Sequence, residues 1–134
     1  MQSKKKNSRT SLVKKLDTEF SIYIRNRFAK NGFAKCITCD KIDLPKNLQC
    51  GHFQSRKHYS TRWNEINCQV QCYACNVMRY GEQYKFGLYL NITYGLETSS
   101  ELILKARETL KLKDFEIIDM INCYKEKNTT FVFD

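Results

Sequence analysis

The sequence predicts a single α+β domain that is mostly α-helical, with one short β-hairpin near its centre. The chain has 134 residues, of which 42% are hydrophobic, so it is long enough for one compact core. Apolar residues recur every three or four positions towards both ends of the chain, which is typical of amphipathic helices. Residues 36–75 lack this period and contain both histidines, the only proline and the only tryptophan. We therefore expect helices around an irregular centre.

The N-terminal third predicts an arm followed by a helix. Residues 1–10 are polar and basic without periodicity, and we expect a mobile arm there. A helix is predicted over residues 11–31, because Asn31 and Gly32 are typical of a left-handed helix end. Its apolar face repeats every four residues and consists of Leu12, Leu16, Phe20, Ile24 and Phe28.

The remaining elements are a hairpin and three helices. Residues 48–54 and 62–68 are predicted to form two strands linked by the polar loop 55–61. The apolar positions that predict the helices are Tyr84, Leu88 and Ile92 before Gly95; Leu102, Ala106 and Leu110 after a cap at Thr98 or Ser99; and Ile117, Ile118, Ile121 and Tyr124 after Asp114. We expect these stripes to face the core. Residues 11–134 thus form one domain, with a core at about 33–95 and C-terminal helices at 98–127.

The charge distribution indicates nucleic acid as a partner. The formal net charge is +9, and residues 1–35 contribute +8 of it through ten basic and two acidic side chains. The alternative is a solvated basic tail. The residues that we assign to DNA contact are Lys4, Lys5, Lys6, Arg9, Lys14, Lys15, Arg56, Lys57, His58 and Arg62. Neither a membrane span nor a secretion signal is visible, which favours an intracellular protein.

Two cysteine pairs predict a structural zinc ion. Cys36 and Cys39 form one C-x2-C pair, and Cys72 and Cys75 form the other. Each pair places two thiolates on one tight turn, so that four sulfurs can surround a tetrahedral zinc ion. Such a site has no open position for a substrate, and any catalytic groups must therefore lie elsewhere. Three further cysteines lack a C-x2-C neighbour and are expected to be small buried hydrophobic residues, namely Cys50, Cys68 and Cys123.

Three polar residues in and after the segment between the cysteine pairs suggest phosphodiester hydrolysis. His52 ends the first predicted strand, Asn67 lies on the returning strand and Asn76 follows the last cysteine of the second pair. A neutral imidazole at His52 can take a proton from water, and a divalent cation stabilises the departing oxygen. Asn76 offers a hard oxygen ligand for Mg²⁺ or Mn²⁺, and Asn67 is expected to orient His52. The alternative is that these residues only make hydrogen bonds inside a zinc ribbon.

The ordered motifs resemble a phage protein family. They are Thr18-Glu19-Phe20, Tyr23-Ile24-Arg25, the Cys36 pair, Gly51-His52-Phe53, Arg62 to Asn67, Gln71 to Asn76, and Gly81. Over residues 17–110 the chain resembles the NinG (Rap) recombination endonucleases of lambdoid phages. The Gly-His and cysteine motifs are also similar to phage endonuclease VII, a ββα-metal (HNH, His-Me finger) junction resolvase.

The resemblance implies a zinc-stapled ββα-metal motif flanked by helices, in an endonuclease that cuts branched DNA such as Holliday junctions and displacement loops. It assigns the general base to His52, a Mg²⁺ or Mn²⁺ ligand to Asn76 and the middle asparagine of the HNH pattern to Asn67. It also implies action on DNA in the cytoplasm of a bacterial host. A symmetric pair of incisions favours a homodimer. The rival interpretation is a non-catalytic zinc-ribbon module that binds nucleic acid.

One position departs from endonuclease VII. Gly51 stands where that enzyme has an aspartate that helps to hold the magnesium ion, so the set of metal ligands is incomplete. His58 and Glu82 are candidates for the missing ligand. The simpler interpretations are a phosphate contact or an exposed side chain for His58, and a charge favoured at a helix start for Glu82.

Overall fold

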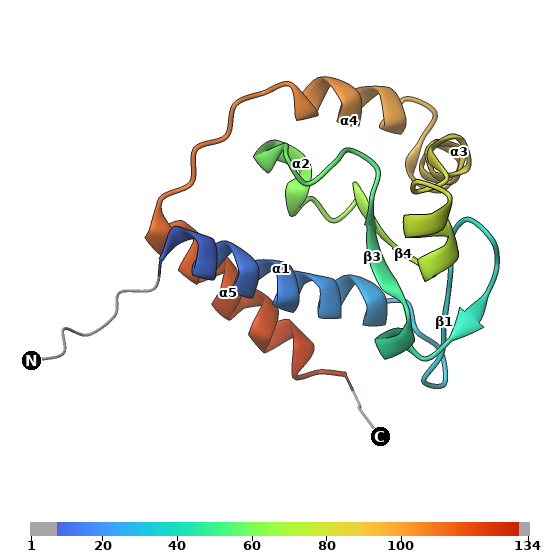
Figure 1. Ribbon diagram of the computed structural model, residues 1–134, viewed down its shortest axis with the longest axis horizontal. Coiled ribbons are helices and arrows are strands. Elements are labelled where there is room, and N and C mark those ends of the chain that lie inside the picture. Colours follow the sequence, from blue (N-terminus) through green and yellow to red (C-terminus); the bar gives the residue numbers. More distant parts are fainter. Residues whose placement is uncertain (1–7, 132–134) are drawn as a thin grey trace, which may run out of the picture.

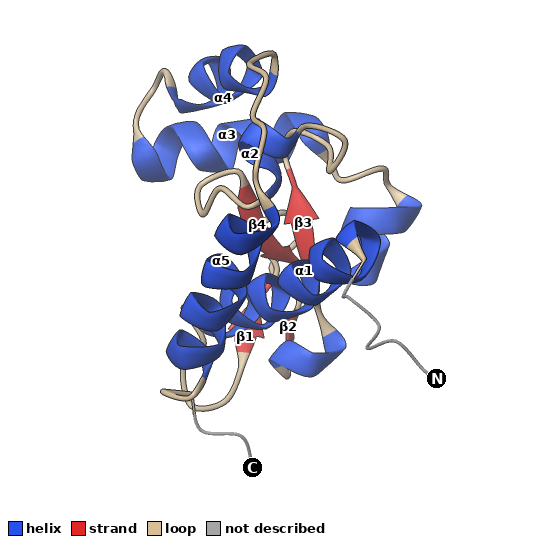
Figure 2. Cartoon of the chain, turned by 90° about the vertical axis from the view of Figure 1, so that its left-hand side faces the viewer, coloured by secondary structure: helices blue, strands red, loops and turns tan. Residues whose placement is uncertain are grey.

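The computed structural model describes residues 8–131 of the chain. Its elements, in order, are α1 (Arg9–Asn26), β1 (Ala34–Lys35), β2 (Ile42–Asp43), the 3-10 turn η1 (Pro45–Asn47), β3 (Gln49–His52), α2 (Tyr59–Arg62), β4 (Cys68–Gln71), the short π-helix η2 (Ala74–Met78), α3 (Gln83–Tyr94), α4 (Thr98–Ala106) and α5 (Asp114–Asn128). Helices α1 and α5 lie side by side, and the hairpin of β3 and β4 lies between this pair and helices α3 and α4 (Figures 1 and 2). The predicted mixture of helices with small sheets is confirmed.

The main core forms between α1 and α5. The predicted apolar face of α1 is confirmed at four of its five positions, because Leu12, Leu16, Phe20 and Ile24 are buried. They pack against Ile117, Ile121 and Tyr124 of α5 and against Trp63. The Phe20 and Tyr124 rings meet edge to face, with centroids 5.0 Å apart.

The ends of α1 differ from the prediction. The helix begins at Arg9, because the Ser8 hydroxyl accepts a hydrogen bond from the Ser11 N–H at 3.1 Å. Arg9 and Thr10 are therefore helical and do not belong to an arm. Lys4, Lys5 and Lys6 lie outside the described residues.

At its other end α1 stops at Asn26, five residues earlier than predicted. The left-handed turn is confirmed, with φ angles of 53° at Asn31 and 82° at Gly32. It reverses the chain between Lys30 and Phe33 instead of capping the helix directly. Phe28 consequently lies beyond the helix and is 58% exposed.

The predicted hairpin exists, but its second strand is displaced. Strands β3 and β4 are antiparallel, with Gln49 opposite Gln71 and His52 opposite Cys68. The second strand thus begins at residue 68 and not at residue 62. Residues 59–62, assigned to the loop and the strand start, form α2 instead, and Trp63 packs into the α1–α5 core.

Helix α3 buries a different face from the one predicted. Tyr84, Leu88 and Ile92 are exposed, and the buried positions are Phe86, Gly87 and Leu90. Both sets have helical spacing, and the packing of α3 against α4 and Phe53 selects between them. Tyr84 therefore does not serve core packing as predicted.

Helices α4 and α5 follow the prediction more closely. Leu102 and Ala106 of α4 are buried, but the helix ends at Ala106 and leaves Leu110 outside it. In α5 the predicted face is confirmed except at Ile118, which is 40% exposed. Cys123 lies on the exposed side of α5 and is not the buried residue that was expected.

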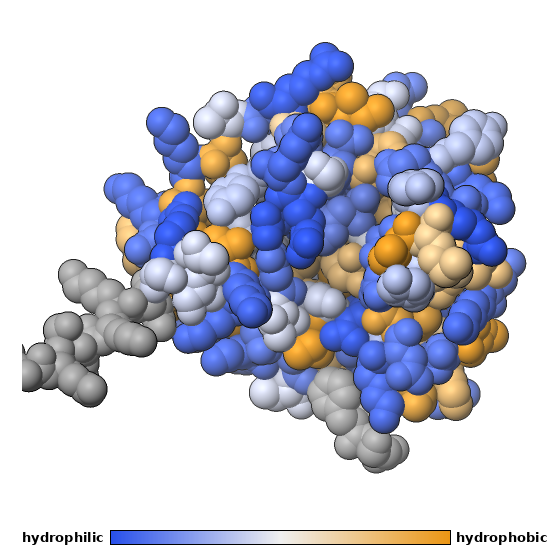
Figure 3. All heavy atoms as spheres, viewed as in Figure 1, coloured by the Kyte–Doolittle hydropathy of each residue, from blue (hydrophilic) through white to orange (hydrophobic). Residues whose placement is uncertain are grey.

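The outer surface shown in Figure 3 is mostly hydrophilic, with apolar residues in small scattered groups. Within residues 8–131, no helix combines the length and the apolar character that a membrane crossing requires.

Candidate metal centre and active site

The four paired cysteines meet at one point, as their spacing predicts. Their sulfur atoms all lie within 4.8 Å of one another, and Sγ of Cys39 is 3.4 Å from Sγ of Cys72. Cys36, Cys72 and Cys75 are buried, whereas Cys39 is exposed. This grouping matches a tetrahedral four-sulfur zinc site, and the cluster can hold a zinc ion.

Each cysteine pair lies on a tight turn. The N–H of Asp40 donates to the carbonyl of Cys36 at 3.2 Å, and Asp40 is left-handed with a φ of 64°. In the second turn the N–H of Asn76 donates to the carbonyl of Cys72 at 2.9 Å. Both turns bring their sulfurs into one cluster, and a bound ion would tie the β1–β2 turn to β4 and η2.

Electrostatics also favour a cation at this cluster. Burial opposes ionisation of Cys36, but hydrogen bonds, first from the Thr38 side chain, outweigh it and lower the pKa to about 7. Although Cys39 as a residue is exposed, partial desolvation of its thiol, together with hydrogen bonds from the neighbouring thiols, raises its pKa to about 12. Four adjacent thiols thus do not all ionise on their own, and a divalent cation supplies the charge that stabilises their thiolate forms.

A pocket of about 740 Å³ lies beside this centre, and it brings together two of the three predicted catalytic residues. His52 from β3 and Asn76 from η2 both line it, together with Asp17 of α1 and Arg56. The hairpin and the turn after the last cysteine therefore place the two residues at one cavity.

A backbone carbonyl fixes the orientation of His52. Nε2 of His52 lies 2.9 Å from the carbonyl oxygen of Arg62. Because a carbonyl only accepts hydrogen bonds, Nε2 carries the proton and the lone pair of the neutral ring is on Nδ1. No hydrogen bond from the described residues reaches Nδ1.

The surroundings of His52 keep the imidazole neutral. Burial lowers the pKa of His52 below its ordinary value, and the positive charges of Arg56 and Arg62 lower it further. The hydrogen bond to the Arg62 carbonyl and the negative charge of Asp17 act in the opposite direction without cancelling the effect of burial.

Asn76 is also held in one orientation. Its Nδ2 donates to Oε1 of Gln49 at 2.7 Å. This bond leaves the carbonyl oxygen Oδ1 without a hydrogen-bond donor among the described residues. A free amide oxygen in a polar pocket fits the hard ligand that Mg²⁺ or Mn²⁺ requires.

Asn67 acts on the backbone and not on His52 itself. Its Nδ2 donates to the carbonyls of Gln54 and Thr61, each at 3.0 Å, and its Oδ1 accepts from the N–H of Gln54 at 2.7 Å. The contact to the imidazole that was predicted for Asn67 is made by the Arg62 carbonyl instead. Asn67 therefore fixes the backbone at Thr61, and the carbonyl of the next residue, Arg62, orients His52.

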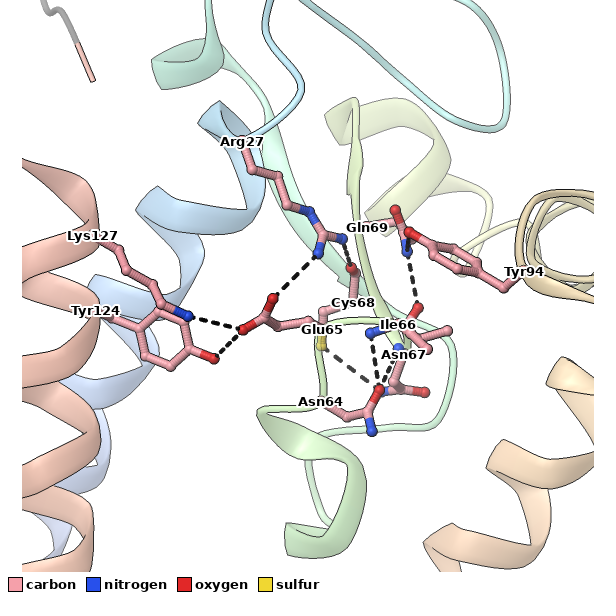
Figure 4. Close-up of polar contacts among 10 residues, drawn as sticks. All are labelled: Arg27, Asn64, Glu65, Ile66, Asn67, Cys68, Gln69, Tyr94, Tyr124 and Lys127. Carbon is pink, nitrogen blue, oxygen red and sulfur yellow. Dashed lines mark hydrogen bonds and ion pairs between the residues drawn. The ribbon is translucent and has the colours of Figure 1, made fainter. Parts of the chain in front are cut away.

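The turn before β4 is itself anchored to α5 and, through an ion pair of Glu65 with Arg27 at 4.0 Å, to the residue that follows α1 (Figure 4). Oδ1 of Asn64 accepts from the N–H groups of Ile66 and Asn67, both at 2.9 Å. Glu65 accepts from the Tyr124 hydroxyl at 2.8 Å and pairs with Lys127 at 3.5 Å. These contacts fix Asn67 relative to α1 and α5.

Arg62 belongs to an internal network. Its guanidinium makes two hydrogen bonds to the Asp17 carboxylate, at 3.0 and 2.5 Å, and a third to the carbonyl of Arg56. Nε1 of Trp63 donates to the same carboxylate at 2.9 Å. The sequence assigns Arg62 to DNA, but these bonds occupy its guanidinium within the protein.

The other basic candidates differ in their availability. Lys14, Lys15, Arg56 and Lys57 are exposed, and Arg56 is the one that also lines the pocket. Arg9 pairs with Asp114 at 2.9 Å. His58 precedes α2, and its carbonyl accepts the N–H groups of Thr61 and Arg62. Neither His58 nor Glu82 belongs to a group of potential metal ligands in the described residues.

The structure gives a steric reason for glycine at position 51. A Cβ atom there would lie 1.9 Å from Oε1 of Gln71, a buried side chain. Nε2 of Gln71 donates to Thr38 and to the carbonyl of Gly81, which restricts its movement. An aspartate at this position would therefore require the Gln71 side chain to move from its hydrogen-bonded place.

Replacing Gly51 with alanine should reduce the free energy of unfolding by about 1–3 kcal/mol, the range for overpacking a buried site. Urea unfolding of Gly51→Ala, Gln71→Ala and the double variant measures this. The double variant should lose less than the sum of the single losses, because the clash is removed. Strictly additive losses would contradict the steric explanation.

Several residues of the site were not predicted from the sequence. Gln49 and Asp17 carry no local motif, and Gln71 was part of a family motif but was given no role. Their roles arise from strand register and from the packing of α1 on the hairpin. The one available signal was the presence of glutamines at buried or half-buried strand positions, where polar side chains require partners.

The fold and the site define a small, mostly helical protein with a β-hairpin, a four-cysteine cluster that can hold a metal ion, and a pocket lined by a histidine. Residues 1–131 match the family model of NinG, the bacteriophage lambda NinG protein, and the chain belongs to this family. The NinG resemblance indicated by the motifs is thus confirmed. No curated protein and no solved structure gives a significant match.

Proposed function

We propose that this protein is a metal-dependent endonuclease that hydrolyses phosphodiester bonds in branched DNA during phage recombination. The observation that carries the proposal is the orientation of His52, which lines the same pocket as Asn76: its Nε2 is bound to a carbonyl, and its Nδ1 accepts no hydrogen bond from the described residues. Membership of a bacteriophage family and the motif similarity to endonuclease VII support the same activity. The net charge of +9 suits a DNA substrate.

His52 is the proposed general base. Its Nδ1 takes a proton from a water molecule whose oxygen attacks the phosphorus, and the bond between phosphorus and the 3′ oxygen breaks. Asn76 would hold Mg²⁺ or Mn²⁺ through Oδ1, and such an ion supplies charge stabilisation at the phosphate and the departing oxygen. Arg56, exposed at the pocket, is positioned for a phosphate contact.

The four-cysteine centre has a structural role in this proposal. Because a four-sulfur zinc ion has no open coordination position, it stabilises the hairpin and takes no part in the reaction. The protein would act on DNA in the cytoplasm of the bacterial host. A homodimer would provide the paired incisions that a four-way junction requires.

Cleavage of a synthetic four-way junction tests the activity. With Mg²⁺ present, the protein should cut the junction faster than a linear duplex that has the sequence of its arms. Binding of both substrates without cleavage in either Mg²⁺ or Mn²⁺ would instead support the zinc-ribbon binding module.

The rate of cleavage should depend on pH through His52. The base must be neutral, and its pKa is lowered by burial, so the rate should rise with pH through a midpoint below the ordinary histidine value of about 6.5. The groups that face the ring are Asp17, Arg56, Arg62, Cys50 and Cys68. Rates at saturating DNA across the acid range measure the midpoint.

Arg56→Gln provides a matched comparison for this pH profile. Arg56 lowers the pKa of His52, so its neutralisation should move the midpoint upward. A wild-type midpoint above 6.5, or a downward movement in the variant, would contradict the assignment of the acid limb to His52.

A further inference from the structure

A second group of soft metal ligands lies next to the pocket, apart from the four-cysteine centre. Sγ of Cys50, a ring nitrogen of His52 and Sγ of Cys68 all lie within 4.8 Å of one another. They come from the two paired strands, since His52 lies opposite Cys68 and Cys50 precedes His52 by two residues on the same face of β3. The register of the hairpin therefore assembles them.

Two of the three side chains share one hydrogen-bond acceptor. The Arg62 carbonyl that accepts from Nε2 of His52 also accepts from Sγ of Cys68, at 3.4 Å. Cys68 is fully buried, whereas Cys50 and His52 both line the pocket. An ion can thus reach the group from solvent through the pocket.

We propose that Cys50, His52 and Cys68 form a binding site for a soft divalent cation such as Zn²⁺ or Cd²⁺. Two thiolates and an imidazole are the ligands that zinc prefers, and three protein ligands leave one position open. Two sulfurs on one zinc ion are at most about 4.6 Å apart, so the present spacing needs little adjustment. The two thiol protons pass to the solvent when the ion binds.

The ligand set also discriminates between metals. Mg²⁺ prefers oxygen ligands and binds thiolates poorly, so it should not compete at this site. A soft ion bound here engages the imidazole of His52. If His52 is the general base, which rests on the proposed function, zinc at this site blocks the reaction that Mg²⁺ supports.

Zinc content measures the site directly. Full-length protein that holds its structural zinc is dialysed against micromolar Zn²⁺, and the zinc content per chain is determined by elemental analysis. The wild type should hold two zinc ions per chain. Cys50→Ser is the main variant, because Cys50 is only half-buried and its replacement disturbs the core least; Cys68→Ser supports it.

Each ligand variant should hold one zinc ion, and its affinity for a second zinc ion should fall at least about tenfold. Removal of a residue that only hydrogen-bonds to a metal ligand already lowers metal affinity by about this factor, so loss of a ligand itself should cost at least as much. Cys123→Ser is the matched control, because Cys123 is an exposed cysteine outside both groups, and it should still hold two. A wild type with one zinc ion, or a Cys50→Ser variant with two, would overturn the proposal.

Inhibition of cleavage separates this site from the proposed activity. In Mg²⁺, added zinc should inhibit the wild type, and Cys50→Ser should need at least about ten times more zinc for the same inhibition. If no DNA is cut under any condition while the zinc count falls from two to one in Cys50→Ser, the endonuclease proposal fails and the metal site stands. If the wild type binds a single zinc ion, the metal site fails whatever the activity.

Discussion

Replacement of His52 by alanine should lower the rate of four-way junction cleavage by about 10²–10⁴-fold, the usual contribution of general-base catalysis. The imidazole lines the pocket and keeps an Nδ1 without a hydrogen-bond partner among the described residues, and alanine leaves the attacking water without this proton acceptor. Single-turnover cleavage at saturating protein measures the chemical step. Zinc content at the four-cysteine centre and affinity for the junction should remain, because His52 is not one of the four sulfur ligands.

The second histidine offers a matched control for this experiment. His58 precedes α2 and uses its backbone carbonyl, so His58→Ala should retain cleavage at saturating protein. Asn76→Ala should lose activity, whereas Asn76→Asp should retain part of it because a carboxylate also binds Mg²⁺. Wild-type cleavage by His52→Ala would exclude the general-base mechanism and favour the binding-module interpretation.

Loss of zinc from the four-cysteine centre should unfold the protein. Zinc binding to structural sites supplies about 10–16 kcal/mol, which is comparable to the total stability of a domain, about 5–15 kcal/mol. Cys36, Cys72 and Cys75 form part of one of the core clusters, together with Leu48 and Val70 of the hairpin region. Without the ion, the two turns would lose their cross-link, and the cluster would contain only buried thiols.

Cys72→Ser and treatment of the wild type with a strong chelator should therefore both abolish cooperative thermal unfolding. Circular dichroism measures the folded fraction, and elemental analysis measures the zinc content. Cys123→Ser should unfold like the wild type, because Cys123 is exposed on α5. A chelated protein that is free of zinc and still unfolds cooperatively would show that the centre is not needed for folding.

Elements with one continuous apolar stripe were predictable from local sequence. The face of α1 is an example, because Leu12, Leu16, Phe20 and Ile24 are its main apolar residues and a helix has no other way to bury them. Helix α3 is the opposite case. It carries apolar residues on several sides, and the neighbouring α4 and Phe53 decide that Phe86 and Leu90 are buried. Residues 59–62 were also misassigned, because their helix depends on tertiary contacts.

The sequence by itself determined that both ends are helical, which family the chain belongs to and which four cysteines form one cluster. Helical periodicity and C-x2-C spacing could be used because both are local properties of the chain. The tertiary structure alone decided which atom holds His52, why residue 51 is glycine and where Arg62 binds. These depend on strand register and on contacts between residues distant in sequence. A hydrogen bond to a backbone carbonyl cannot be predicted from the type of residue that provides the carbonyl, since every residue has one.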